Sequence, residues 1–118
     1  MTGQNRQLGA SGEDVAAQWY LDAGYQLVAR NWRCRDGELD LVLTGHGAVV
    51  FSEVKTRTSD RFGIPAEAVS VTKQRRIRGL AARFLREHPG IGAAGRGRLR
   101  FDVVSILDGT ISVIEGAF

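Results

Sequence analysis

The chain has 118 residues, of which 43% are hydrophobic and 25% charged, as is usual for one globular domain. A chain of this length buries about two-thirds of its unfolded surface, which suffices for a core without disulfides. The longest apolar run, Ala48 to Phe51, cannot span a bilayer, and no signal peptide is visible at the N-terminus. The single Cys34 excludes an internal disulfide and a zinc site built on paired cysteines. We expect one domain over residues 1–118, with an ordered core of about 8–118, in a soluble cytoplasmic protein without membrane association.

The charges are distributed unevenly. Sixteen Lys and Arg residues against thirteen Asp and Glu residues give a net charge of +3, and fourteen of the sixteen are Arg. Up to Lys55 there are five basic and seven acidic residues, and from Thr56 onward eleven basic and six acidic ones. Because Arg makes bidentate contacts with phosphate, this second half favours a nucleic-acid partner. The alternative is a coding bias toward Arg with a solvated helix face, since the net charge is modest.

In the first half of the chain the pattern predicts one helix and three strands. Leu8 to Ala23 has a helical stripe, and Gly24 suits the end of that helix. The stripe consists of Leu8, Gly12, Val15, Ala16, Trp19, Tyr20 and Ala23. The predicted strands are Tyr25 to Arg33, Glu38 to Thr44 and Ala48 to Arg57, separated by turns at Asp36-Gly37 and Gly45-His46-Gly47. The third strand is the most apolar, so we expect it in the centre of a sheet.

In the second half the pattern predicts a polar loop, a long helix and two more strands. The loop is Thr58 to Pro65, and the helix runs from about Ala66 to Glu87 with Ser70 or Thr72 as a cap. Its core stripe is Ile77, Leu80, Ala81, Phe84 and Leu85. Pro89 ends this helix, Gly90 to Gly97 is a mobile basic loop, and the strands are Leu99 to Leu107 and Thr110 to Ile114. The order α-β-β-β-α-β-β predicts an α/β fold with a mixed sheet flanked by helices.

Acidic residues and one lysine occupy the ends of two predicted strands. Alternation places Glu53 and Lys55 on the face of Val49 and Phe51. The same rule places Glu38 and Asp40 on one face, opposite Leu39 and Leu41. If the two strands are neighbours, Asp40, Glu53 and Lys55 converge at one end of the sheet.

Such a corner suits phosphodiester hydrolysis. Negative charge accumulates on the phosphate oxygens in the transition state, and Mg²⁺, bound by carboxylates, neutralises it. A lysine two residues after one acid can orient the attacking water and favour its hydroxide form. Glu-x-Lys alone is a weak signal, and an ordinary ion pair at a strand end is the alternative interpretation. The placement of these charges at the end of an apolar, central strand favours the metal site.

Several other residues have both a functional and a structural interpretation. Glu13 is either a third carboxylate of the site or an acid stabilised by the dipole of the first helix. Lys73, near the start of the second helix, either points at a phosphate or extends from the edge of the apolar stripe. The arginines of this helix are either a solvated face or a surface that follows a nucleic-acid backbone. They are Arg75, Arg76, Arg78, Arg83 and Arg86, and the glycine-rich loop adds Arg96 and Arg98, followed by Arg100.

The sequence resembles the YraN-like family of small bacterial proteins along nearly the whole chain, from Gly9 to Phe118. The segments that carry the resemblance are Gly12-Glu13, Asn31-Trp32-Arg33, Gly37-Glu38-Leu39-Asp40-Leu41, Phe51-Ser52-Glu53-Val54-Lys55-Thr56-Arg57, Phe62-Gly63, Pro65, Glu67-Ala68-Val69, Lys73, Arg76, Arg100-Phe101-Asp102-Val103 and Ala117-Phe118. That family looks like part of the PD-(D/E)XK nuclease superfamily, which has the restriction-endonuclease-like fold and is similar to Holliday-junction resolvases.

The resemblance implies roles for individual residues. Asp40 matches the first acid of the motif, and Glu53 and Lys55 match its E-x-K part. Glu13 matches the helix-borne acid of the resolvase-like branch, and Lys73 or Gln74 the accessory polar position. Ser52 departs from the motif, where an apolar residue is more usual, and we expect only a packing effect from it.

Together these observations predict a Mg²⁺- or Mn²⁺-dependent endonuclease that acts on DNA rather than RNA, with branched or damaged DNA as candidate substrates. We expect Asp40, Glu53 and the Val54 carbonyl to hold the metal, Lys55 to activate water and Glu13 to assist. The expected nucleic-acid-binding residues are Lys73, Gln74, Arg75, Arg76, Arg78, Arg96 and Arg98. Junction substrates would favour a homodimer. A non-catalytic nucleic-acid-binding module with the same fold is the main alternative, and a scaffold role is a weaker one.

Overall fold

The computed structural model describes residues 11–57 and 69–118. The predicted helix start at Leu8, the loop from Thr58 to Pro65 and the predicted helix start at Ala66 lie outside the described residues. The helices are α2 (Gly12–Asp22), α3 (Val71–Glu87) and α4 (Pro89–Ala94). The strands are β1 (Gln26–Cys34), β2 (Gly37–Gly45), β3 (Ala48–Arg57), β4 (Leu99–Leu107) and β5 (Thr110–Ile114). The predicted order of elements is confirmed, with the short α4 added after α3.

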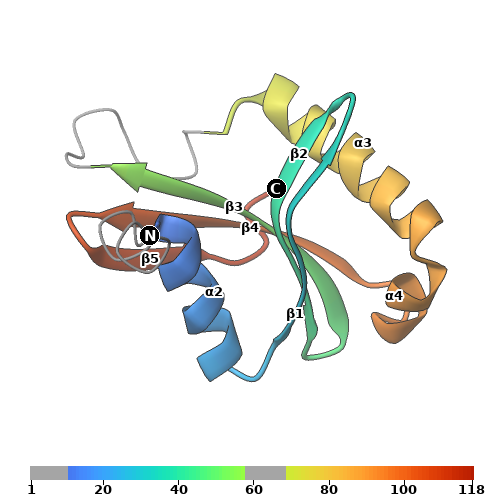
Figure 1. Ribbon diagram of the computed structural model, residues 1–118, viewed down its shortest axis with the longest axis horizontal. Coiled ribbons are helices and arrows are strands. Elements are labelled where there is room, and N and C mark those ends of the chain that lie inside the picture. Colours follow the sequence, from blue (N-terminus) through green and yellow to red (C-terminus); the bar gives the residue numbers. More distant parts are fainter. Residues whose placement is uncertain (1–10, 58–68) are drawn as a thin grey trace, which may run out of the picture.

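The five strands form one mixed sheet in the order β1-β2-β3-β4-β5. Only β3 and β4 are parallel, because the chain crosses over through α3 and α4 between them. The other neighbours are antiparallel hairpin pairs. β3 is therefore the central strand, as its apolar sequence predicts. Helix α2 lies on one side of the sheet, and α3 lies on the other (Figure 1).

Two buried clusters, one on each face, hold the helices against the sheet. The cluster under α3 contains Leu39, Val42, Val49, Phe51, Val69, Ile77, Leu80, Ala81, Phe84, Phe101 and Val103. The cluster under α2 contains Ala16, Ala17, Tyr20, Tyr25, Leu41, Leu43, Val50, Val104 and Ile106. The predicted core stripe of α3 is thus confirmed, with Leu85 partly buried at its edge.

Helix α2 begins at a capping box, in which the Ser11 side chain accepts from the Asp14 N–H and the Asp14 carboxylate accepts from the Ser11 N–H. Only part of its predicted stripe is correct. Ala16 and Tyr20 are buried, whereas Val15 is 39% exposed and Ala17 is buried instead. The buried face of α2 is narrow because Ala16 and Ala17 are small, which lets the helix lie close to the sheet. Gly24 follows the helix with φ 96°, a left-handed conformation that glycine adopts without strain.

The predicted mobile loop from Gly90 to Gly97 is wrong in its first half. Helix α4 occupies Pro89–Ala94, and a turn at residues 95–97 follows it. The physical reason is that proline ends one helix but also suits the first position of the next, where its missing N–H is not needed. Pro89 therefore separates two helices rather than a helix and a loop.

Candidate active site

The strands β2 and β3 separate at Asp40. Their pairing runs from Gly45 opposite Ala48 to Leu41 opposite Ser52 and ends there. Beyond this point a side chain takes the place of the β2 backbone as the acceptor: the Val54 N–H of β3 donates to Asp40 Oδ2 at 2.9 Å. The carboxylate is thereby held in the opening between the two strands.

This separation corrects the alternation predicted for β2. Leu39 and Leu41 were expected on one face, but Leu39 packs under α3 and Leu41 packs under α2. The backbone of β2 twists where it leaves β3, so regular alternation does not continue across Asp40. Glu38 and Asp40 therefore do not lie on one simple face opposite both leucines.

The environment of Asp40 favours its protonated form. Burial is the largest cause and raises the pKa of Asp40 to about 6, while the Val54 N–H opposes the shift. The negative charges of Glu53, Glu13 and Glu38 raise it further. The carboxylates of Glu53 and Glu13 are thus near enough to Asp40 to act on its charge.

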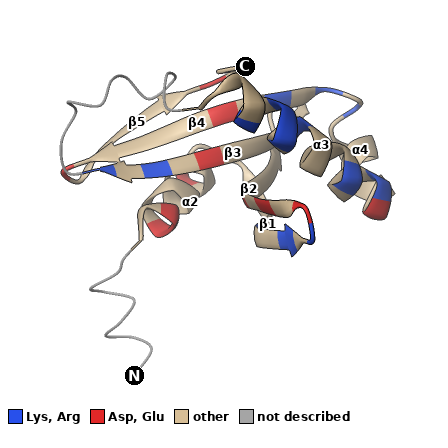
Figure 2. Cartoon of the chain, turned by 90° about the horizontal axis from the view of Figure 1, so that it is seen from above, with Lys and Arg blue, Asp and Glu red and all other residues tan. Residues whose placement is uncertain are grey.

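Glu53 is 9% exposed and lies beside two ammonium groups. Its Oε2 is 2.7 Å from Lys73 Nζ and 3.7 Å from Lys55 Nζ. Lys55 comes from the same strand, and Lys73 comes from the first turn of α3, where the Ser70 side chain accepts from the Lys73 N–H. Figure 2 shows the red acidic position of β3 followed by blue basic positions toward the end of the strand.

The two lysines differ in their electrostatics. The interaction with Lys73 is the largest cause that lowers the pKa of Lys55, and burial lowers it further. The negative charges of Glu53 and Asp40 oppose this shift. Burial alone would lower the pKa of Lys73 too, but the hydrogen bond to Glu53 reverses the direction and raises it. Lys73 therefore stays charged, and Lys55 is the amine that more readily loses its proton.

Glu13 reaches the same corner from the other face of the sheet. It lies at the start of α2 and pairs with Arg30, whose Nε is 3.4 Å from Glu13 Oε1. A cleft of about 530 Å³ opens beside it, and Val54 and Thr56 of β3 line the opposite wall. Glu13 is thus close enough to act on Asp40 electrostatically, and it shares Arg30 with Asp14.

The donor set fits Mg²⁺ or Mn²⁺ chemically. A hard divalent ion takes one or two carboxylates with backbone carbonyls, water and substrate phosphate. Asp40 has one oxygen bound to Val54 and another left for an ion, and Oε2 of Glu53 is already beside the two lysine ammonium groups. In residues 11–57 and 69–118, no three His, Cys, Asp or Glu side chains are grouped for a metal, so substrate and solvent would complete the shell.

The structure separates the predicted nucleic-acid-binding residues into three groups. Only Lys73 reaches the corner. The Gln74 amide is used locally, because it donates to the Val69 carbonyl before α3. Arg96 and Arg98 flank the turn before β4, at the end of the sheet where Val49 lies opposite Leu99, far from Glu53 and Lys55.

The arginines of α3 also point in different directions. Arg75 and Arg76 line a groove between this helix and Asp36 in the turn after β1. The Arg78 guanidinium instead lies over the rings of Phe101 and Phe118, with its centre 4.7 and 5.5 Å from the ring centroids. Arg78 therefore contacts the C-terminal residues and is not part of the same surface as Arg75 and Arg76.

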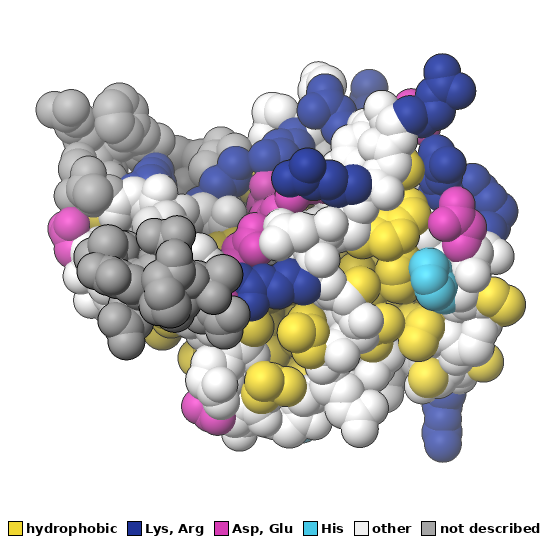
Figure 3. Space-filling view, viewed as in Figure 1, with side chains coloured by type: hydrophobic (Ala, Val, Ile, Leu, Met, Phe, Trp, Pro, Cys, Tyr) yellow, Lys and Arg dark blue, Asp and Glu magenta, His cyan; other side chains and the backbone are white. Residues whose placement is uncertain are grey.

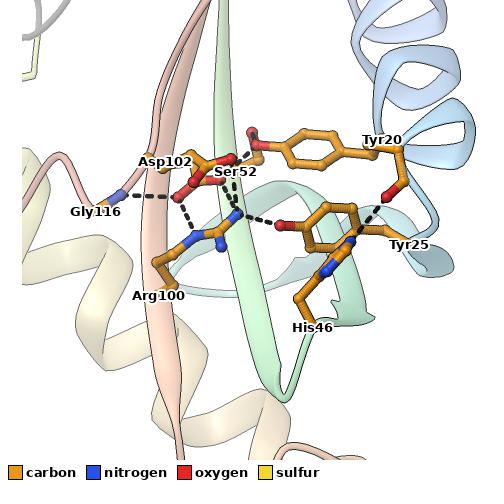
Figure 4. Close-up of polar contacts among 9 residues, drawn as sticks. Tyr20, Tyr25, His46, Ser52, Arg100, Asp102 and Gly116 are labelled. Carbon is orange, nitrogen blue, oxygen red and sulfur yellow. Dashed lines mark hydrogen bonds and ion pairs between the residues drawn. The ribbon is translucent and has the colours of Figure 1, made fainter.

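Sequence analysis missed a buried polar network on the α2 side of the sheet (Figure 4). Asp102 is fully buried and accepts from Arg100 at 2.9 Å through both oxygens and from the Gly116 N–H at 3.0 Å. The Tyr20 hydroxyl lies 2.7 Å from Asp102 and 3.0 Å from Ser52. Arg-x-Asp in an apolar strand was the available signal for it.

The network changes two expectations. Ser52 has a polar contact with Tyr20 rather than a packing effect alone. Arg100, expected among the arginines that follow a nucleic-acid backbone, instead binds Asp102 and donates to the Tyr25 hydroxyl at 2.9 Å. Both side chains stabilise the contact between α2 and the sheet.

Fold and site together define a small α/β protein with a five-stranded mixed sheet and a corner of acids and lysines at the end of its central strand. Residues 12–106 match the family described as uncharacterised protein family UPF0102. The chain belongs to this family. The resemblance is thus confirmed at the level of the UPF0102 family, whereas membership of the nuclease superfamily stays a prediction.

Similar proteins from other bacteria carry the same family name. The UPF0102 protein of Nocardia farcinica is 51% identical over 105 residues, which cover 89% of this chain and 80% of the relative. The UPF0102 protein of Mycolicibacterium vanbaalenii is 48% identical over 117 residues, which cover 98% and 93%. That of Rhodococcus opacus is 50% identical over 105 residues, covering 89% and 86%. Among residues 11–57 and 69–118, no helix is long and apolar enough to cross a membrane.

Proposed function

We propose that the protein is a Mg²⁺- or Mn²⁺-dependent endonuclease that hydrolyses phosphodiester bonds of DNA. The observation that carries this proposal is the convergence of Asp40, Glu53, Lys55 and Lys73 where β2 leaves β3. An ordinary strand-end ion pair needs one acid and one base. Here two acids and two lysines from three elements meet at a partly buried site, and burial raises the pKa of one of the acids.

Each side chain has a role that its surroundings support. Asp40 and Glu53, with the Val54 carbonyl, would hold the ion, which when bound supplies positive charge that stabilises the reacting phosphate. Lys55 would orient the attacking water and accept its proton at Nζ, a role that its lowered pKa favours. Lys73 stays charged and would move from Glu53 to a phosphate oxygen. Glu13, paired with Arg30, would tune the corner electrostatically.

Cleavage assays test the proposal directly. We expect the wild-type chain to cut at least one of duplex, single-stranded and branched DNA in the presence of Mg²⁺ or Mn²⁺, and EDTA to abolish cleavage. Glu53→Gln keeps the size of the side chain but removes a metal-binding carboxylate, so cleavage should fall by about a hundredfold or more. Measured rates of product formation on labelled DNA give the comparison.

Glu115→Gln is the matched control. It removes the same charge, but Glu115 is 51% exposed, lies 3.8 Å from Arg100 and is outside the lysine contacts. This variant should cleave at the wild-type rate. If the wild-type and Glu53→Gln proteins bind DNA equally and neither cuts any substrate, the chain is a non-catalytic nucleic-acid-binding module and the hydrolytic proposal is wrong.

A further inference from the structure

Between α3 and the turn that joins β1 to β2 lies a groove of about 400 Å³, outside the acid–lysine corner. Its lining residues are Asp36, Arg75, Arg76, Gly79, Leu80, Arg83 and Arg86. Leu80, the one apolar side chain among them, is 3% exposed, so the charged side chains are the accessible binding groups of the groove. Figure 3 shows Lys and Arg side chains gathered over the α3 side of the molecule.

The charges in this groove are not balanced internally. Arg83 lies 3.5 Å from Asp36 and 3.1 Å from Glu87. No ion pair is found for Arg75, Arg76 or Arg86 with any other part of the chain that the structure describes. Four guanidinium groups thus surround the groove against two nearby carboxylates, which leaves positive charge for an anionic ligand.

Gly79 lies in the middle of the groove and has no structural explanation. It is an interior residue of the 17-residue helix α3, where glycine is the poorest helix former after proline. A Cβ at this position would meet no atom within 4 Å, so packing does not require a glycine. Its φ does not lie in the left-handed range either. A glycine that is neither packed nor strained leaves room for a ligand to approach the helix backbone.

The groove and Lys73 belong to the same helix but face different sides of it, because a helix has about 3.6 residues per turn. Lys73 and Arg86 are thirteen residues apart on one helix, or about 20 Å at 1.5 Å per residue. Phosphates follow one another every 3.4 Å along the axis of a DNA strand, so this length corresponds to about six of them. A duplex presents regularly spaced phosphates to the guanidinium groups of one helix, which a flexible single strand does not.

We propose that this α3 groove binds the phosphate backbone of the duplex flanking the reacting phosphate. The proposal rests on the proposed function for the position of the reacting phosphate, but the groove's own affinity for DNA does not. A lipid surface is disfavoured, because membrane-surface helices insert exposed apolar side chains and this groove presents none.

Two substitutions at one residue test the groove without disturbing the fold. Gly79→Glu places a carboxylate among the arginines, whereas Gly79→Ala fills no occupied space and is the matched control. Binding of the full chain to a labelled duplex of about 20 base pairs is measured by fluorescence anisotropy in EDTA, where no cleavage occurs. We expect Gly79→Glu to weaken binding about tenfold or more at about 0.1 M salt and Gly79→Ala to bind like wild type.

The salt dependence gives an independent readout. Arg86→Gln should reduce the slope of log Kd against log salt by about one, because one phosphate contact is lost. Arg33→Gln removes the same charge from β1, where the side chain is 75% exposed and pairs with Glu38, and should leave the slope unchanged. Thermal unfolding of each variant confirms that it is folded.

Defined outcomes would overturn the inference. The groove is not the binding surface if Gly79→Glu binds like wild type, or if Arg86→Gln and Arg33→Gln change the slope equally. Single-stranded DNA that binds as tightly, with the same sensitivity to Gly79→Glu, would disprove the duplex assignment. If polyglutamate with the same total charge as the duplex displaces the duplex from the chain, the groove is a site for acidic proteins and not for DNA. Groove-dependent binding without any cleavage would instead disprove only the proposed function.

Discussion

Asp40 shows how one side chain can be held firmly and still be electrostatically unfavourable. The Val54 N–H binds one of its oxygens and stabilises the charged form. Burial and three neighbouring acids act in the opposite direction and more strongly, so the pKa rises to about 6. A bound cation would remove this cost, which is the behaviour expected of a metal ligand in the absence of its metal.

The raised pKa predicts a specific dependence of stability on pH. A carboxyl that titrates at 3.8 when unfolded and about 6 when folded stabilises the fold below pH 4, and this contribution is lost as the pH rises through 6. The loss amounts to at most about 3 kcal/mol. Asp40→Asn keeps a side-chain oxygen that can accept from the Val54 N–H. Its amide does not titrate, so this variant does not lose stability as the pH rises through 6. In EDTA, urea unfolding should show it about 1–3 kcal/mol more stable than wild type at pH 8 and similar at pH 4. Parallel pH profiles would contradict the prediction.

Two helical glycines illustrate how each element is placed against its neighbours. Gly12 is the first residue of α2, and a Cβ there would overlap the Thr56 side chain of β3 and lie 2.9 Å from Ile106 Cδ1. Gly79 in α3 meets nothing. The first glycine therefore sets how closely α2 approaches the end of the central strand, next to Glu13, and the second leaves a groove open.

Gly12→Ala should destabilise the protein by about 1–3 kcal/mol, because the added methyl group overpacks the contact of α2 with β3. Gly79→Ala is the same chemical change in open space and should stabilise the protein by about 0.5–1 kcal/mol through better helix propensity. Denaturant unfolding of both variants and wild type gives the comparison. Equal effects of the two substitutions would show that the contact between α2 and β3 does not depend on Gly12.

At the scale of the whole molecule, the Asp102 network connects parts that are distant in sequence. It joins α2 through Tyr20, β3 through Ser52, β4 through Arg100 and the C-terminal residues through Gly116. A fully buried carboxylate is costly unless it is paired, and here its hydrogen bonds come from all these segments. The network thus stabilises the sheet on the face opposite the α3 groove.

Removing the carboxylate charge should therefore affect the entire fold. Asp102→Asn leaves the Arg100 guanidinium without its partner, and we expect a loss of about 3–5 kcal/mol in the free energy of unfolding. Glu115→Gln removes a second carboxylate, 3.8 Å from the same guanidinium but 51% exposed, and should cost less than about 1 kcal/mol. Chemical denaturation measures both. Similar losses for the two variants would mean that the burial of Asp102 does not determine its contribution.

Local patterns in the sequence were sufficient for the elements and for part of the site. Hydrophobic periodicity located the buried stripe of α3, and turn residues separated the strands, because both signals depend on neighbours within a few positions. The same alternation placed Glu53 and Lys55 with Phe51 on one face of the central strand, where the structure has them. The short α4 was missed, since Pro89 both ends one helix and begins another.

The remainder was decided by contacts between elements. Asp40 reaches the corner because β2 leaves β3 there, and regular alternation carries no information about where two strands separate. Sequence spacing likewise could not distinguish Arg75, which lines the α3 groove, from Arg78 over the C-terminal rings or Arg100 bound to Asp102. Sequence by itself determined which residues carry charge and on which element. Only the tertiary structure decided which charges meet, because the partner of each lies on another segment of the chain.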